Sequence, residues 1–525
     1  MQKHWADKLA DKVVEERGDK DSYVFNFGMS LSGKMHIGNL RGELTIPSRV
    51  EKILKSRGKN ASIRGVFYTQ DPFKAKKAQL EQFDDPEEAK KYEGWRLKDV
   101  PDPEGCHSNW PEHFNSENSP YFEDFGINVD PITTTEFYRM DETKELVRKF
   151  LKNKDKVREI LNQYRERNPY PEGWIPFVPF CENCKTIRDS TALDIDFDEG
   201  KVQYECECGD SGWSDIEEGK LTWRLEWSAL WHVLDVDFEP YGKDHATPGG
   251  SRDSCVALCE EFDLNYPTGF AFNWVYWKRN GEVKDMTSSG NVGMTAKEFL
   301  EVSEPEVLVY LYMSTKPMKE IYFSPEDIPD YYRRFDRAER IYFGEDEARS
   351  EKRERNIKRN YELTVKTVPD KKPIRVPYGS CVMVAQLTSD KDRALELFKK
   401  MEQVPEDLSE EERKNILERL KKAGNWVERY GTEEDLIQVQ ESIGPDIKDR
   451  LSDGQINMLR KLKKELEERE MDVEGIQSRI YEMRDEFELS SGEVFSAIYL
   501  ALLGEDKGPR AGQLIKALGE ERVIS

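Results

Sequence analysis

The sequence predicts an α/β fold with a parallel sheet, interrupted by an insertion and followed by an all-α region. Three observations predict this order. Residues 23–27 (YVFNF) and 60–68 (NASIRGVFY) have the apolar and aromatic content of strands, and a glycine-rich turn and an amphipathic helix separate them. The α/β pattern stops near residue 71 and resumes near residue 221. After residue 317 the chain has mostly helical spacing and many charges.

Length and composition limit the class of protein. A chain of 525 residues is too long for one hydrophobic core, so we expect several domains. The 104 acidic and 80 basic residues give a net charge of −24, which argues against nonspecific coating of nucleic acid but allows a local basic groove. No apolar run is long enough to cross a membrane, so we expect a cytoplasmic protein with no membrane partner. Eight cysteines in such a chain indicate metal rather than disulfides.

The order of elements indicates where the α/β fold opens and closes. The first two strands and the helix between them form a βαβ unit, which requires a parallel sheet. An aperiodic stretch, a helical stretch and a Gly- and Asp-rich segment with four cysteines follow before the α/β pattern returns. The expected segments are two halves of the α/β domain at 1–115 and 221–300, an insertion at 116–220, a helical region with a linker at 301–375, and a helical domain at 376–525.

The turn at residues 28–39 (GMSLSGKMHIGN) joins the first strand to a helix. Free N–H groups and the helix dipole make such a helix start a phosphate site. His36 and Asn39 fall in the first helical turn, where their side chains can donate to phosphate oxygens. A core histidine beside an ordinary turn explains this stretch equally well. The glycines that would let a nucleotide approach the backbone are Gly28, Gly33 and Gly38.

A second small, hydroxyl-rich loop lies at residues 286–293 (MTSSGNVG), late in the α/β part. Its serines and backbone amides could hold the far end of a triphosphate. Two such loops in one α/β domain favour a nucleotide site over an ordinary turn.

Together the two stretches resemble the HIGH and KMSKS signatures of class I aminoacyl-tRNA synthetases, here His36-Ile37-Gly38-Asn39 and Asp285-Met286-Thr287-Ser288-Ser289. Further blocks resemble the archaeal-type class I lysyl-tRNA synthetase family in particular, and they extend from about residue 23 to the C-terminus. Among these blocks are DVPDPEGCH, PFVPFCENC, WRLEWSALW, YGKDHATPGGS, VPYGSCVMVAQL and GPRAGQLIKALGEERVI.

This resemblance implies a Rossmann-type nucleotide-binding domain with a zinc-binding insertion, followed by an all-α anticodon-binding domain at 376–525. It implies a lysine–tRNA ligase that activates lysine with ATP and Mg²⁺ to lysyl-adenylate and transfers it to the 3′-terminal adenosine of tRNA(Lys). We expect a monomer. The net-basic linker at 371–380 (KKPIRVPYGS) is suited to contact with tRNA phosphates, although a helical bundle that only exposes its charges to water is the alternative for this region.

The same resemblance implies the residues of the ATP site. Catalysis would come from alignment and from stabilising charge on phosphate oxygens, with His36, Asn39, Ser288 and Ser289 as the groups that act. The expected ATP-binding residues are Gly28, Ser32, Gly33, His36, Gly38, Asn39, Met286, Thr287, Ser288 and Ser289.

The second signature departs from the family pattern. The usual loop has lysines that neutralise the leaving pyrophosphate, but here Asp285 stands at the first lysine position and Ser289 is followed directly by Gly290. Lys284 could replace the lost charge and is the expected catalytic lysine. Mg²⁺ and loop amides could also suffice, or activation could be lost in a paralogue that only binds RNA.

The resemblance also implies a lysine pocket made of Gly28, Ser30, Trp223, His245 and Phe272, the last at a position where the family has tyrosine. Aromatic walls suit the aliphatic part of lysine and offer a cation–π contact to its ammonium. A carboxylate should face the ammonium, and Asp244 and Glu226 are both candidates. A glutamate- or glutamine-activating enzyme is the alternative, but glutamate would call for an arginine in the pocket, and none stands out in the sequence.

Four cysteines in two pairs predict a structural zinc site: Cys181, Cys184, Cys206 and Cys208. Four thiolates around zinc stabilise an insertion that is too small for its own core. A redox CxxC motif is the competing interpretation, but it would not need the second pair. Cys255, Cys259 and Cys381 are expected to be buried packing residues.

A second zinc site is expected in the segment PDPEGCHSNWPEH, at Asp102, Cys106, His107 and His113. A thiolate, two imidazoles and a carboxylate suit tetrahedral zinc if the backbone bends at Gly105. The segment has little apolar content to pack into a core, so a bound metal could stabilise its fold instead. Loop residues or RNA contacts are the alternative.

Overall fold

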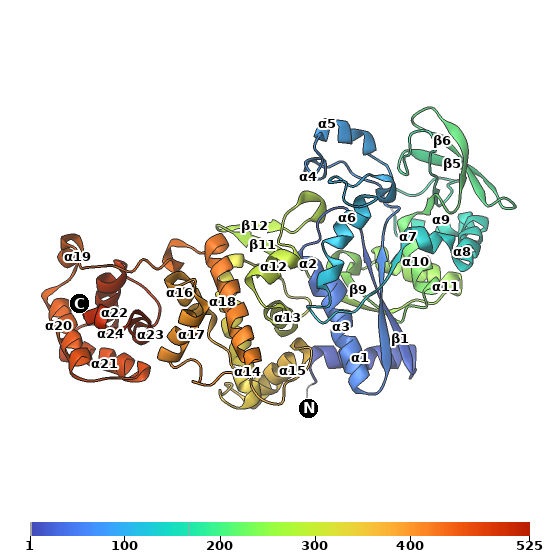
Figure 1. Ribbon diagram of the computed structural model, residues 1–525. Helices are drawn as coiled ribbons and strands as arrows, with labels where there is room; N and C mark the ends of the chain where they lie inside the picture. Colours follow the sequence, from blue (N-terminus) through green and yellow to red (C-terminus); the bar gives the residue numbers. More distant parts are fainter. Residues whose placement is uncertain (1–2, 166, 525) are drawn as a thin grey trace. The chain divides into compact units, whose positions relative to one another are not determined.

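The computed structural model describes residues 3–165 and 167–524 of the chain. These residues form two compact units (Figure 1). The first comprises Met1–Phe299, Val309–Phe323 and Glu362–Lys366, and the second comprises Leu300–Leu308, Ser324–Tyr361 and Thr367–Ser525. The first unit contains all the strands of the described residues, whereas the second is helical. This arrangement confirms the predicted α/β fold followed by an all-α region.

A five-stranded parallel sheet forms the centre of the first unit, in the order β10-β9-β1-β2-β3. The predicted βαβ unit is confirmed, because β1 pairs in parallel with β2. Ser22 lies opposite Asn60 at one end of the pairing, and Met29 lies opposite Phe67 at the other. Later strands are added on both sides of β1, so the strand order reverses between β1 and β9, and ligands of such sheets bind at that point. The strands are β1 (Ser22–Met29), β2 (Asn60–Phe67), β3 (Asp130–Thr133), β9 (Phe238–Gly242) and β10 (Thr268–Phe272).

Strand β1 is apolar along most of its length because helices cover a parallel sheet on both faces. Phe25 and Phe27 are buried. Asn26, also buried, donates to Glu239 of β9 over 2.8 Å, which links the two strands beside the switch point. The surrounding helices include α1 (Trp5–Arg17), α3 (Ile46–Ser56), α10 (Trp223–Val233) and α11 (Ser251–Glu261).

The turn after β1 leads into a helix of mixed geometry. A short α2 (Ile37–Asn39) continues into a π-helical segment (Leu40–Thr45) and then into α3. Gly42 lies in the π-helical segment, where a Cβ atom would come within 2.2 Å of the Phe272 ring. The helix start therefore lies close to the carboxyl end of β10.

Residues 71–116 form a lobe with a core of its own, and the segment 101–113, which was expected to have little apolar content, contributes Trp110 to that core. Phe73, Trp110 and Phe114 are completely buried in it, and the Phe73 and Trp110 rings meet edge to face with centroids 5.0 Å apart. The aromatic residues are irregularly spaced in the sequence, so no periodicity predicts the cluster. Short helices bring these residues together. These helices are α4 (Lys77–Leu80), α5 (Pro86–Ala89) and α6 (Trp110–Ser116).

The segment between β3 and β9 holds helices and a small antiparallel sheet. Helices α8 (Asp141–Lys152) and α9 (Lys154–Asn162) confirm the expected helical stretch, and a short α7 (Thr134–Arg139) precedes them. Strands β5 (Ser190–Asp196), β6 (Lys201–Cys206) and β7 (Ser211–Asp215) form one sheet, and β4 (Phe177–Val178) pairs with β8 (Lys220–Leu221). The segment from 116 to 220 thus includes β3 of the central sheet as well as the cysteine-bearing part.

Strands β11 (Val275–Arg279), β12 (Glu282–Asp285) and β13 (Ile321–Phe323) form a further sheet, and β12 leads into the hydroxyl-rich loop. Two helices follow this loop, α12 (Ala296–Val302) and α13 (Pro305–Ser314). The apolar run VLVYLYM is helical in α13. No helix among the described residues is long and apolar enough to span a membrane.

The second unit contains a buried arginine, Arg419, which forms ion pairs with Glu304 and Asp336.

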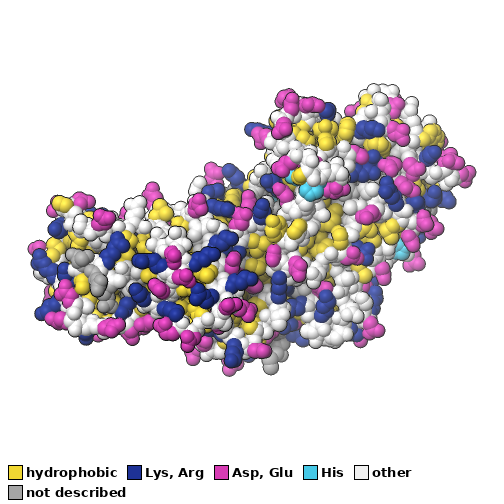
Figure 2. Space-filling model, in the orientation of Figure 1, with side chains coloured by type: hydrophobic (Ala, Val, Ile, Leu, Met, Phe, Trp, Pro, Cys, Tyr) yellow, Lys and Arg dark blue, Asp and Glu magenta, His cyan; other side chains and the backbone are white. Residues whose placement is uncertain are grey.

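On the face shown in Figure 2, basic and acidic side chains are intermixed rather than separated into large areas of one sign. The later helices are α14 (Ile328–Phe343), α15 (Glu351–Thr364), α16 (Tyr378–Leu387), α17 (Lys391–Lys400), α18 (Glu410–Tyr430), α19 (Pro445–Arg450), α20 (Asp453–Glu468), α21 (Val473–Glu486), α22 (Ser491–Leu503), α23 (Ala511–Leu518) and α24 (Glu520–Ile524).

Candidate active site

The turn after β1 and the hydroxyl-rich loop pack against each other. Gly33 has a φ of 154°, and a Cβ atom there would lie 2.6 Å from the carbonyl oxygen of Ser288. Gly293, with a φ of 137°, lies against the side chain of His36 in the same way. The backbone N–H of Ile37 donates to the Met294 carbonyl over 2.8 Å. Glycine is therefore required where the two loops meet, since any side chain would separate them.

His36 stands at the start of α2 with a largely buried ring. Burial lowers the pKa of His36 to about 4, so the imidazole is neutral near pH 7. Its Nδ1 atom is buried and has no hydrogen-bond partner among the described residues. A Cβ atom on Gly38 would lie 2.8 Å from this Nδ1. A buried ring nitrogen without a partner, beside a glycine and a helix start, is what a phosphate-binding histidine requires.

Asn39 ties the helix start to an acidic residue. Its Oδ1 accepts from the His36 backbone N–H over 3.3 Å, and its Nδ2 donates to Glu43 Oε2 over 3.2 Å. Burial, with help from the nearby carboxylates of Asp244 and Glu239, raises the pKa of Glu43 to about 7.

A cavity of about 500 Å³ lies between the two loops. It brings together most of the residues expected to bind ATP. Those that line it are Ser32, His36, Gly38, Asn39, Met286, Thr287, Ser288 and Ser289. Lys284 does not line it: this side chain is 61% exposed on β12 and forms an ion pair with Glu282 over 2.9 Å. Lys243 lines the cavity instead and was not expected from the sequence.

A second cavity, of about 300 Å³, adjoins the carboxyl ends of β1 and β9. Four residues of the expected lysine pocket line it, together with the candidate carboxylate Glu226: Gly28, Ser30, Trp223 and His245. Phe272 lines the first cavity rather than this one, and Asp244 lines neither. Asp244 lies beside the pocket, with its Oδ2 atom 3.4 Å from His245 Nε2.

This second cavity is acidic and aromatic. Four carboxylates line it, those of Glu43, Asp71, Glu226 and Glu239. Its aromatic lining also includes Tyr68, Trp227, Tyr241 and Trp274. Such a lining favours a ligand with an apolar stem and positive charge.

Two of the carboxylates are already occupied by protein donors. Glu239 accepts from Trp227 Nε1 and Trp231 Nε1 over 2.7 and 2.8 Å, besides Asn26. Glu226 accepts from the Tyr138 hydroxyl over 2.8 Å and pairs with the buried Lys220 over 2.9 Å. These carboxylates are therefore structural partners within the pocket wall.

The other two carboxylates keep oxygens available. Asp71 uses Oδ1 to pair with Lys220 over 2.6 Å, and no hydrogen bond among the described residues reaches its Oδ2. Within the described parts of the chain Glu43 accepts only from Asn39, and it is the one acidic residue of the second cavity that also lines the first. Both were missed from the sequence. Asp71 follows a strand of the parallel sheet, where binding residues gather, and that position could have indicated it.

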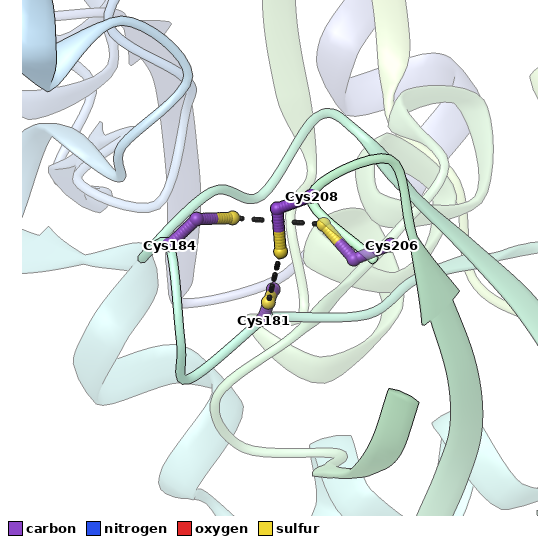
Figure 3. Close-up of side chains that lie close together, drawn as sticks. All are labelled: Cys181, Cys184, Cys206 and Cys208. Carbon is purple, nitrogen blue, oxygen red and sulfur yellow. Dashed lines mark hydrogen bonds between the residues drawn. The ribbon is translucent and has the colours of Figure 1, made fainter. Parts of the chain in front are cut away.

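The four cysteines of the first expected metal site come together (Figure 3). Cys181 and Cys184 lie on one loop, Cys206 ends β6, and Cys208 follows it, with all four as free thiols. The Sγ atoms of Cys184 and Cys206 are 3.5 Å apart, and those of Cys181 and Cys208 are 3.8 Å apart. Four sulfurs bound at ~2.3 Å to one tetrahedral zinc would lie about 3.8 Å apart, so these thiols fit that ion.

The second expected group also comes together, in the lobe of residues 71–116. Cys106 Sγ lies 3.0 Å from His107 Nδ1 and 3.3 Å from His113 Nδ1. Asp102 Oδ1 lies 3.0 Å from His113 Nδ1. Gly105 has a φ of 69°, the bend that lets Cys106 and His107 face the same point. One thiol, two ring nitrogens and a carboxylate within 4.8 Å of one another fit a tetrahedral metal.

The remaining cysteines expected to be packing residues, Cys255, Cys259 and Cys381, are all buried.

Comparison with known proteins identifies the family. The model of the family "tRNA synthetases class I (K)" matches residues 3–367, and that of an anticodon binding domain matches residues 432–525. A lysine–tRNA ligase of Aeropyrum pernix is 38% identical over 540 residues, covering 100% of this chain and 97% of the relative. One of Methanocaldococcus jannaschii is 33% identical, with coverages of 99% and 98%. Among solved structures, a glutamate–tRNA ligase of Elizabethkingia meningosepticum aligns with 96% of this chain and 98% of its own at 12% identity, with a TM-score of 0.38.

Proposed function

The chain belongs to the class I tRNA synthetases of the lysine type, and on this premise we propose that it is a lysine–tRNA ligase that uses ATP. In the first step a carboxylate oxygen of lysine attacks the α-phosphorus of ATP, and the bond to the bridging oxygen breaks as pyrophosphate leaves. In the second step the terminal ribose hydroxyl of tRNA(Lys) attacks the lysyl carbonyl, and AMP leaves. Neither step needs a protein nucleophile, so binding geometry and charge do the catalysis.

One observation supports lysine above other amino acids: an aromatic cavity with four carboxylates opens beside the phosphate-binding turn. Among the described ion pairs made by its four carboxylates, the one cationic partner is Lys220, which Asp71 and Glu226 share. Burial raises the pKa of Glu43, Glu226 and Glu239, but carboxyl groups still outnumber this one ammonium, so the pocket favours a diamine over the acidic side chain of glutamate.

We assign the two ammonium groups of lysine to the two carboxylates with available oxygens. Glu43 lines both cavities, so it suits the α-ammonium, which lies next to the reacting carboxylate. Asp71, with Oδ2 open, suits the ε-ammonium. Glu226 and Asp244, the earlier candidates, fit less well because Glu226 is occupied and Asp244 lies outside the cavity.

The phosphates would occupy the larger cavity, at the start of α2 and against Ser288 and Ser289. His36 is neutral, so it would donate one N–H to the phosphate oxygens as charge builds on them, without exchanging a proton. Asn39 would hold the helix start in place through its bonds to His36 and Glu43. Mg²⁺, when bound, would neutralise part of the triphosphate charge.

We propose zinc at both metal-binding groups, with a structural role in each. The cysteine group would join the loop of Cys181 to the end of β6, and the mixed group would close residues 102–113 onto α6. Neither lies in the cavities assigned to lysine and ATP. The region matched by the anticodon-binding model would read the tRNA through unstacked bases.

Exchange of labelled pyrophosphate into ATP, with each amino acid added separately, tests this function. We expect exchange with lysine and none with glutamate. Strong exchange with glutamate but not lysine would show a different synthetase. No exchange with any amino acid, from a folded protein that still binds tRNA, would show the RNA-binding paralogue instead.

A further inference from the structure

The hydroxyl-rich loop lacks the lysines that its resemblance leads one to expect. Asp285 occupies the first position, and Ser289 is followed directly by Gly290. Given the proposed function, on which this inference rests, pyrophosphate leaves with several negative charges that build up beside this loop. A cation already fixed beside the loop would lower the barrier to the departure of pyrophosphate more than a cation that must first bind from solution.

The lysines near the loop differ in what already binds them. Lys284 forms an ion pair with Glu282 and does not line the cavity. Lys243 lines the cavity but donates to the Tyr276 hydroxyl and pairs with Glu320 over 3.4 Å. Each of these two ammonium groups is thus already paired with a carboxylate, which would compete with phosphate for it.

A third lysine, Lys76, reaches the loop from a distant part of the chain. Lys76 is exposed and does not itself line the cavity, but its Nζ atom donates over 2.9 Å, across 213 residues of sequence, to the hydroxyl of Ser289, which does line it. Lys76 caps the start of α4, which packs against the short helical turn of Ser288–Gly290. Among the residues that the structure describes, Lys76 forms no ion pair, so its charge is not neutralised by a neighbouring carboxylate.

The position of Lys76 is set by the phosphate-binding turn itself. Gln79, which is 2% exposed, accepts from the Lys76 backbone N–H over 3.0 Å and donates to the Ser32 carbonyl over 2.8 Å. Trp110, in the core of the same lobe, donates to the neighbouring Leu31 carbonyl over 3.0 Å. Two buried side chains therefore hold the lobe to consecutive carbonyls of the turn, with Lys76 above the loop.

We propose that Lys76 replaces the missing signature lysine and neutralises the β- and γ-phosphates of ATP and the leaving pyrophosphate. The hydroxyl of Ser289 holds the ammonium in place until phosphate oxygens take over as acceptors. The bond that forms is between the lysine carboxylate and the α-phosphorus, and the electron pair of the broken bond leaves on pyrophosphate. Lys76 contributes charge and transfers no proton.

Lysine-dependent ATP–pyrophosphate exchange by Lys76→Ala tests the proposal, with thermal unfolding as a check of folding. We expect the exchange rate to fall at least about tenfold, because one charged donor to the transition state is removed. The rate of lysyl transfer from isolated lysyl-adenylate to tRNA should stay within about twofold, since pyrophosphate has already left at that stage. Lys76→Arg should keep most of the exchange rate.

The matched control is Lys77→Ala, one residue further on the same helix, where the side chain is 89% exposed and pairs with Glu81. It should exchange like the unsubstituted protein. Inserting a lysine between Ser289 and Gly290 should restore exchange to Lys76→Ala, because the charge is then supplied from the loop.

Exchange by Lys76→Ala within about twofold of the unsubstituted protein would overturn the inference, as would equal losses in both transfer and activation. A loss in Lys284→Ala with none in Lys76→Ala would assign the charge to Lys284 instead. Failure of the unsubstituted protein to exchange with lysine would contradict the proposed function, which separates that outcome from failure of this inference alone.

Discussion

At the level of single residues, Glu43 links the chemistry of the two cavities. Its carboxyl has a pKa of about 7 because of burial and the carboxylates of Glu239 and Asp244, against an ordinary value of 4.5. Below pH 7 the Glu43 carboxyl is therefore mostly protonated in the free protein, and it becomes a carboxylate as the pH rises through 7. Only the carboxylate form attracts an ammonium strongly.

We therefore expect kcat/KM for lysine in the exchange reaction to rise with pH and to level off above about pH 7, since this ratio reports pKa values of the free enzyme. Glu43→Gln should lower the ratio and remove the rise. Asp71→Asn is the matched variant: it should raise KM for lysine about tenfold or more at every pH, through loss of one charge-assisted hydrogen bond, but retain the rise. A pH dependence that survives in Glu43→Gln would remove Glu43 from this role.

At the level of elements, the two groups proposed to bind zinc lie in segments that differ in packing. The cysteine group has only a small cluster of buried side chains around it, including Cys181, Tyr204 and Cys206. The mixed group lies in a lobe with an aromatic core of its own. Removal of the first metal should therefore unfold its segment locally, whereas the second lobe should keep part of its structure.

Metal analysis of the protein purified without chelators should find two zinc ions per chain. The Cys106→Ala/His107→Ala variant should bind one, and hydrogen exchange should rise most near residues 102–113. Cys181→Ser/Cys184→Ser should also bind one, with exchange rising across β6 and β7. A single zinc in the unsubstituted protein would leave Asp102, Cys106, His107 and His113 as loop or RNA contacts.

The elements nearest the site were the predictable ones. A strand, a glycine turn and a helix with His36 at its start follow from local sequence pattern. The spacing of Cys181, Cys184, Cys206 and Cys208 likewise predicts that these four thiols lie together. The lobe that contains Phe73 and Trp110 was not predictable, because aromatic residues spaced irregularly show no period until they are folded together. Lys76 and Glu43 were missed for a related reason: each matters through a contact with a residue distant in sequence or in a second cavity.

At the level of the whole molecule, a buried cluster of ion pairs in the second unit determines where the chain can be truncated without loss of folding. Arg419 is 2% exposed and donates to both carboxylate oxygens of Glu304 and of Asp336, over 2.8–3.1 Å. Burial alone would raise the pKa of Glu304, but Arg419 and Arg375 lower it to about 2. This pairing therefore stabilises the fold above pH 4.5 and is lost as pH falls toward 2.

Removal of residues 376–525 would take away Arg419 and leave Glu304 and Asp336 without it. Breaking a buried pair in this way costs roughly 3–5 kcal/mol, so that truncation would lose activity through misfolding. Ending the chain at residue 431 keeps the cluster and removes the region matched by the anticodon-binding model. We expect this shorter chain to keep lysine-dependent exchange within about twofold while KM for tRNA rises at least about tenfold. If it is folded by circular dichroism yet loses exchange as well, the two regions do not have separate roles, because a region that only reads tRNA has no part in adenylate formation.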